Sequence, residues 1–201
     1  MITKLDLADN AFFKEGGEAL AVAIKTMPNL RHLSLRDGSL ENGAVVALGH
    51  AIAAVCPPLV HLDLSGNELG ADPEDEGEDG CVENSAAFAA LQVAILGVAS
   101  SLEVLMLEDN ELGSMAATLV TPLTQCSALK QLQLNCNEIS GRTAVKLATA
   151  VVASKAAVSL ELDGNTIREE SVETMETMLG EVEGAGLKEM DDNDPDGDEE
   201  E

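Results

Sequence analysis

Apolar and polar residues alternate along the chain in a recurring pattern, L-x-x-L-x-L-x-x-N-x-L, in which other aliphatic residues sometimes replace leucine. Six segments follow it: ITKLDLADNAF, LRHLSLRDGSL, LVHLDLSGNEL, LEVLMLEDNEL, LKQLQLNCNEI and AVSLELDGNTI, which begin at residues 2, 30, 59, 102, 129 and 157. The L-x-L core of each segment puts its leucines on one face of a strand and the intervening residues on the other. We therefore predict six short strands, centred on Leu5, Leu33, Leu62, Leu105, Leu132 and Leu160.

One polar position is shared by the six segments and follows each predicted strand. It is occupied by Asn10, Gly38, Asn67, Asn110, Asn137 and Asn165, at spacings of 28, 29, 43, 27 and 28 residues. A carboxamide can hydrogen-bond backbone groups of its own turn and of the neighbouring turns, so we assign the asparagines a structural role. Gly38 lacks the amide, and its turn is expected to be looser.

The second half of each repeat has the apolar spacing of a helix. Pairs four residues apart lie on one face: Leu20 and Ile24, Leu48 and Ile52, Leu147 and Val151. In the last helix, EESVETMETMLGEV, the other positions are filled by Glu and Thr, as expected for the end of a repeat array. Strand and helix alternating at about 28 residues predict an α/β fold, a leucine-rich-repeat solenoid. A parallel sheet would line its concave face, and helices its convex face.

The domain organisation follows from the repeats. Residues 1–187 are expected to form one solenoid, with an acidic loop insertion at residues 71–84 inside the long interval. Residues 188–201 are expected to form a disordered acidic tail. Because the first segment starts inside a strand without a preceding cap, we expect the chain to be the carboxyl-terminal part of a longer solenoid.

Composition and charge narrow the classes of partner. The chain has 45% apolar residues but only three aromatic ones, which indicates an aliphatic core built in stacked layers. Its formal net charge is −26; residues 72–83 hold −7 and residues 181–201 hold −10. Such a charge argues against nucleic acid or an anionic membrane and favours a basic protein partner. No segment is long and apolar enough for membrane insertion.

The carboxyl terminus contains D-x-D-x-D-G, starting at Asp192, which resembles the first half of an EF-hand calcium loop. An EF-hand needs a bidentate glutamate at its twelfth position and a helix on each side. The twelfth position would fall beyond Glu201, so we interpret this stretch as a solvated acidic tail.

Other candidates for chemistry are weak. The four cysteines form no C-x-x-C pair, and Cys56 and Cys126 stand at equivalent places in two repeats, which indicates packing of reduced thiols. The predicted concave face contains three residues of the types that bind zinc, His32, His61 and Asp63. Ordinary polar contacts between concave residues are the simpler interpretation of this group. We find no nucleophile paired with a base and no phosphate-binding loop, and we expect no cofactor and no metal.

The concave face and the corners where the strands end form the expected binding surface. A solvated surface without a specific partner remains the simpler interpretation for any single residue in it. As a set, we predict partner contacts at Lys4, Asp6, Asp9, His32, Arg36, Asp37, His61, Asp63, Glu108 and Asp109.

Several stretches resemble the Ran GTPase-activating proteins, most closely those of plants and algae. They are LEVLMLEDNELG, KLDLADNAFFKEGGEALAVAI, NLRHLSL and the tail EMDDNDPDGDEEE. The repeats alone are also shared by ribonuclease-inhibitor-like proteins, whereas repeats followed directly by this acidic tail are more specific. The resemblance implies a GTPase activator without an active site of its own, which binds Ran in its GTP form and sustains nuclear transport.

The resemblance also implies that the catalytic residues of the family have no counterpart in this chain. In the family, an asparagine orders the glutamine of the GTPase, and this asparagine and its supporting arginine lie in repeats before the one matched by ITKLDLADN. No catalytic residue is therefore assigned here. The expected location is cytoplasmic, with the nuclear envelope as an alternative. The alternative function is a non-catalytic leucine-rich-repeat interaction scaffold.

Overall fold

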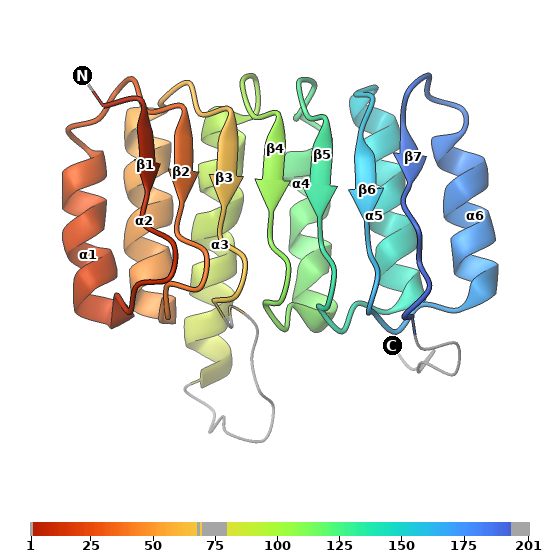
Figure 1. Ribbon diagram of the computed structural model, residues 1–201, viewed down its shortest axis with the longest axis horizontal. Helices are drawn as coiled ribbons and strands as arrows, with labels where there is room; N and C mark the ends of the chain where they lie inside the picture. The colour runs from red at the N-terminus through yellow and green to blue at the C-terminus, as the bar shows by residue number, and fades with distance from the viewer. Residues whose placement is uncertain (1, 68, 70–79, 194–201) are drawn as a thin grey trace.

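The protein is a curved array of strand–helix units. The computed structural model describes residues 2–67, 69 and 80–193, without the side chains of residues 80–84. Within them, seven strands form one parallel sheet in sequence order (Figure 1). They are β1 (Lys4–Asp6), β2 (His32–Ser34), β3 (His61–Asp63), β4 (Val104–Met106), β5 (Gln131–Gln133), β6 (Ser159–Glu161) and β7 (Gly186–Leu187). The fold is thus the predicted α/β leucine-rich-repeat solenoid.

Helices cover one face of the sheet and leave the other open (Figure 1). They are α1 (Phe13–Ile24), α2 (Asn42–Val55), α3 (Gly80–Val98), the 3₁₀-helix η1 (Gly113–Leu119), α4 (Val120–Leu123), α5 (Gly141–Ser154) and α6 (Glu169–Leu179). No helix in the described part of the chain combines the length and apolar character needed to cross a bilayer.

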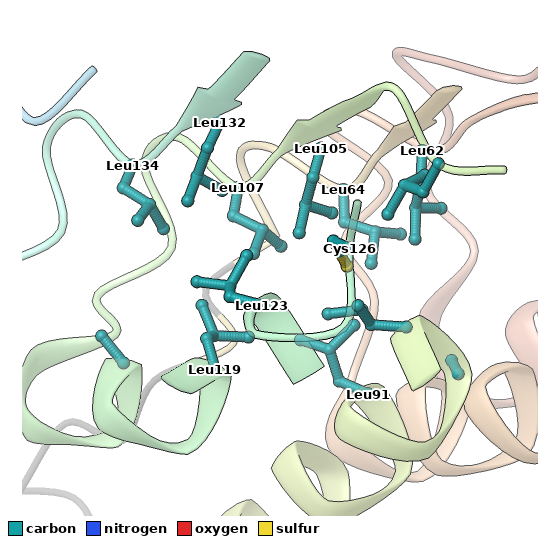
Figure 2. Packing of buried hydrophobic residues seen from close by; sticks show 14 of the residues in the cluster. Leu62, Leu64, Leu91, Leu105, Leu107, Leu119, Leu123, Cys126, Leu132 and Leu134 are labelled. Carbon is teal, nitrogen blue, oxygen red and sulfur yellow. The ribbon is translucent and has the colours of Figure 1, made fainter. Parts of the chain in front are cut away.

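The predicted register of the repeats is confirmed. Leu5, Leu33, Leu62, Leu105, Leu132 and Leu160 are successive partners in the ladder. Figure 2 shows Leu105 of β4, and Leu107 just after this strand, on the side of the sheet that faces Leu119 and Leu123. All four are buried, so each repeat contributes a layer of aliphatic side chains to one continuous core.

The fourth repeat differs from the prediction of a full helix in each repeat. Between β4 and β5 the chain forms η1 and then a four-residue α4. Pro122 is the third residue of α4. Proline has no backbone N–H and is tolerated only in the first turn of an α-helix, so the α-helical turn begins just before it.

The predicted limits of the insertion and the tail need correction. Helix α3 begins at Gly80, so residues 80–84 of the predicted insertion are helical, while residues 71–79 lie outside the described residues. At the other end, the predicted disorder does not hold for residues 188–193. The backbone N–H of Lys188 donates to Leu160 at 2.9 Å, and that of Asp192 donates to the Asp163 carboxylate at 2.9 Å.

The asparagine column forms a chain of hydrogen bonds through the solenoid. The backbone N–H of Asn67 donates to Asn110 Oδ1, that of Asn110 to Asn137 Oδ1, and that of Asn137 to Asn165 Oδ1, at 3.0–3.1 Å. The backbone N–H of Asn165 continues to Asn193 Oδ1 at 2.9 Å. Asn193 is 28 residues after Asn165, so it is a seventh member of the column, and its amide joins residues 188–193 to the sixth repeat.

The first repeat is joined to the second in a different way. Asn10 is exposed and donates only to the carbonyls of its own turn, Leu7 at 3.0 Å and Ala8 at 2.9 Å. Gly38 offers no amide oxygen, and the N–H of Phe12 donates to the Gly38 carbonyl at 2.8 Å instead. Backbone bonds therefore replace the side-chain bond at this junction.

The described cysteines have different environments. Cys56, Cys126 and Cys136 are free thiols. Cys126 is buried, and burial raises its pKa to about 11. Cys56 is exposed and has a left-handed backbone with φ 45°, so the prediction that it packs like Cys126 is wrong. It caps the carboxyl-terminal end of helix α2, and its backbone N–H donates to the Ile52 carbonyl at 2.8 Å.

Candidate functional site

The concave face over β1–β3 carries an ion pair within one strand and a contact between two histidine rings on neighbouring strands. Lys4 Nζ lies 3.6 Å from Asp6 Oδ2, and both side chains are exposed. The rings of His32 and His61, which are partners in the β2–β3 register, have centroids 5.8 Å apart and are tilted by 32°. The structure thus brings together four of the residues predicted to contact a partner.

Asp63 is more buried than the other predicted contact residues on this face, and its carboxylate is hydrogen-bonded. Its carboxylate accepts a hydrogen bond from Ser34 Oγ at 3.1 Å and another from the backbone N–H of Ser65 at 3.1 Å. Its exposed fraction is only 6%. Asp63 therefore acts mainly as an anchor of this face and contributes little surface to a partner.

The environment of His61 favours its neutral form. Burial lowers the pKa of His61, and the neighbouring His32 and Lys4 act in the same direction, against the opposing carboxylates of Asp63 and Asp6. At neutral pH the two stacked rings therefore carry no repulsion from a charged His61.

We expect this histidine to make the fold sensitive to acid. Its folded-state pKa is lowered, so as the pH falls through about 6.5 the unfolded chain takes up the proton before the folded chain does. Stability should fall across this window and stop falling once the folded imidazole also protonates. Urea unfolding at a series of pH values should show a smaller loss in His61→Gln than in the wild type.

A matched control is available on the opposite surface. His50 is exposed on α2, and His50→Gln should retain the wild-type pH dependence. An identical loss of stability on acidification in His61→Gln and in the wild type would contradict the assignment.

The concave face changes in character from β4 onward. Val104 and Met106 form an apolar strip on β4. On the next strands, Gln131 Nε2 and Gln133 Nε2 donate to the two oxygens of Glu161 at 3.0 and 2.8 Å. Beside this carboxylate lies an open hollow of about 450 Å³, lined by Asn135, Glu161, Asp163, Lys188 and Glu189.

The corners after the strands form an acidic ridge with a common backbone shape. In each of the six repeats the residue just before the column position has φ between 49° and 68°: Asp9, Asp37, Gly66, Asp109, Cys136 and Gly164. Glycine and aspartate adopt this left-handed conformation more easily than most residues. Asp9, Asp37 and Asp109 are exposed, so local backbone geometry presents their carboxylates to solvent.

Arg36 links two of these corners. Its guanidinium lies 3.2 Å from Asp37 Oδ2 and 3.7 Å from Glu108 Oε2. Because Arg36 and Glu108 belong to the repeats on either side of the third, their ion pair spans the corner at Ser65, which is fully buried. Arg36 thereby offsets part of the negative charge of the ridge.

The ridge is negative enough to affect a neighbouring thiol. Burial raises the pKa of Cys136, and the carboxylates of Glu108, Asp109, Asp163 and Asp192 raise it further. A cysteine in this field stays protonated at neutral pH and is a poor nucleophile.

The possible zinc site is not formed. Across the residues that the structure describes, no group of three or more His, Cys, Asp and Glu side chains is arranged to hold a metal ion. His32 and His61 stack on one another, and the Asp63 carboxylate is directed to Ser34 and Ser65.

Sequence reasoning missed two parts of this surface. The Gln131–Gln133–Glu161 contact is formed across strands, and only the register shows that these polar residues meet. Asn193 was assigned to the tail, although its spacing of 28 residues from Asn165 is a signal that could have identified it.

Comparison with known proteins agrees with the repeats. The family model described as "Leucine Rich repeat" matches residues 1–21 and 55–72. RAN GTPase-activating protein 2 of Arabidopsis thaliana is 30% identical over 166 residues, which are 80% of this chain. Monocyte differentiation antigen CD14 is 34% identical in Oryctolagus cuniculus and 33% identical in Homo sapiens, each over 117 residues and 55% of this chain.

The lengths of these relatives differ from that of the chain. The chain spans 27% of the length of the plant protein and 30% of that of CD14. The match to the plant protein extends over most of the repeats, in agreement with the resemblance to Ran GTPase-activating proteins.

Proposed function

We propose that this leucine-rich-repeat protein, similar to a Ran GTPase-activating protein, binds a Ran-like small GTPase in its GTP form and acts on GTP hydrolysis by it. The observation that carries the proposal is the 30% identity to RAN GTPase-activating protein 2 over 80% of the chain. The expected location is the cytoplasm, with the nuclear envelope as an alternative.

The surface has the chemistry that such a partner would need. The open face of the sheet offers polar contacts, and the ridge presents the carboxylates of Asp9, Asp37 and Asp109 along one edge. A rim of one charge speeds the approach of an oppositely charged protein and fixes its orientation. We therefore assign the ridge to the first contact with a basic surface of the GTPase.

A second function has some support from the comparisons. The match to CD14 covers 55% of this chain at 34% identity, although the name of that protein refers to no GTPase. The repeats are thus compatible with a non-catalytic interaction scaffold, which would bind a partner without changing GTP hydrolysis.

Single-turnover hydrolysis by Ran-GTP, with and without this chain, tests the proposal. Activation in trans requires a group within hydrogen-bonding reach of the attacking water or the glutamine that orients it. The resemblance assigns no residue here to that role, so we expect salt-sensitive binding and an acceleration far below that of RAN GTPase-activating protein 2. Absence of binding at low salt would reject the GTPase proposal.

Full acceleration would contradict the absence of a catalytic residue in this chain. Asn10 would then be the first residue to replace, because it is exposed while Asn67, Asn110, Asn137 and Asn165 are buried. Binding without any acceleration would favour the scaffold.

Matched charge variants locate the contact. Asp9→Asn with Asp109→Asn removes two carboxylates from the ridge, and asparagine tolerates the left-handed backbone. Glu173→Gln with Glu176→Gln makes the same change on the exposed side of α6. Weaker Ran-GTP binding by the first pair alone would support the ridge, whereas equal effects would indicate only general charge attraction.

A further inference from the structure

The convex surface over the middle repeats is uncharged. Residues 42–56, 85–102 and 112–129 contain no Asp, Glu, Lys or Arg, in a chain with a net charge of −26. The other convex helices are charged: α1 carries Lys14, Glu15 and Glu18, α5 carries Arg142 and Lys146, and α6 carries four glutamates. The neutral region therefore covers α2, η1, α4 and the part of α3 from residue 85 onward, whereas Glu83 lies in the first turn of α3.

Helix α3 forms the centre of this region and is fixed on both sides. Gly49 of α2 lies so close to α3 that a Cβ there would come within 2.6 Å of the Ala90 carbonyl oxygen. On the other side, Gln92 Nε2 donates to the Thr118 carbonyl at 3.1 Å. The residues of α3 that face outward are thus held in place by contacts on its flanks.

Four exposed residues of α3 form a stripe along the helix, which we name the α3 stripe: Ser85, Ala89, Val93 and Leu96. The exposed fractions of Val93 and Leu96 are 44% and 40%. The spacings of four, four and three residues keep the stripe on one face over about 16 Å, at the usual rise of an α-helix.

The order of residues in the stripe is self-complementary. Leu96 and Ala89 lie at equal distances, about 5 Å, on either side of the midpoint between residues 92 and 93. In an antiparallel copy related by a two-fold axis through this midpoint, each Leu96 faces Ala89 of the second copy. Val93 lies close to the axis, and Ser85 of each copy lies at one end of the contact. A large residue thus faces a small one, as ridges pack into grooves between helices.

We propose that the α3 stripe is the contact of a two-fold symmetric homodimer of this protein. Charge favours a second copy here, because two chains of −26 can approach without direct like-charge contacts only where neither carries charge. A phospholipid surface is a poorer occupant, since the region has no Lys or Arg to attract headgroups.

Sedimentation velocity of the full chain at increasing concentration tests the proposal. The wild type should shift from monomer to dimer, and salt should strengthen the dimer by screening the repulsion between the chains. Leu96→Glu should raise the dissociation constant at least about tenfold, by burying a carboxylate at the contact. Val22→Glu, the same kind of change at a 66% exposed position on α1, should have no such effect.

Mixing two variants tests the register. Ala89→Lys and Leu96→Glu should each impair self-association, but their mixture should form a heterodimer in which Lys faces Glu at one of the two contacts. Circular dichroism verifies that both variants are folded. A wild type that stays monomeric, equal effects of Leu96→Glu and Val22→Glu, or no recovery in the mixture would each overturn the proposal. Binding of the monomer to phosphatidylcholine vesicles that Leu96→Glu abolishes would assign the stripe to lipid and overturn it as well.

Discussion

Replacing Asn137 by alanine should lower the free energy of unfolding by about 3–5 kcal/mol, because buried groups that lose their only partner keep their full desolvation cost. Asn137 is completely buried. Its Oδ1 accepts from the backbone N–H of Asn110 at 3.1 Å and of Leu112 at 3.4 Å, and its Nδ2 donates to the Leu107 carbonyl at 2.8 Å. Alanine cannot replace any of these bonds, and water has no access to the site.

Asn10→Ala provides the matched control for this change. The bonds of Asn10 are confined to its own exposed turn, so water can replace them and the expected cost is below about 1 kcal/mol. Equilibrium urea unfolding of both variants measures the difference. Similar losses at the two positions would show that the side-chain bonds between repeats contribute little.

The second large effect is expected in the core. Leu105→Ala should cost about 2–5 kcal/mol, the usual range for a buried leucine whose removal leaves a cavity. Leu105 is completely buried and pairs with Leu62 and Leu132 in the middle of the sheet. Layers of side chains on both sides limit how far the structure can collapse into the space.

Leu187→Ala is the comparison for the core change. Leu187 is partly exposed on the two-residue strand β7, which has a neighbouring strand on one side only among the residues that the structure describes. Its surroundings can relax, and we expect a clearly smaller loss than for Leu105. Thermal melting of the two variants compares them directly, and equal shifts would contradict the assignment of the core.

The sequence predicted some contacts of the candidate surface and missed others. The pairing of His32 with His61 and the exposure of Asp9, Asp37 and Asp109 follow from the repeat register, since equivalent positions of neighbouring repeats lie side by side. The Arg36–Glu108 ion pair and the burial of Ser65 beneath it depend on how long side chains bend across three repeats. Packing and charge together determine these side-chain conformations, and the repeat pattern of the sequence does not specify them.

The sequence by itself determined six of the seven strands, β1 to β6, their order, their inward leucines and the asparagine column up to Asn165, whereas β7 was not predicted. These features depend on a period of two residues within a strand and a period of about 28 residues between repeats. Both periods can be recognised in the amino-acid sequence. The tertiary structure alone decided how the array ends and how its repeats differ. Residues 188–193 join the solenoid because the sixth repeat offers Asp163 and Asn165 as partners, and an acidic composition does not reveal those partners. Asn10, likewise, is exposed because β1 is the first strand of the described sheet, whereas the Asn67 amide donates to the Leu35 carbonyl of the preceding repeat at 2.9 Å.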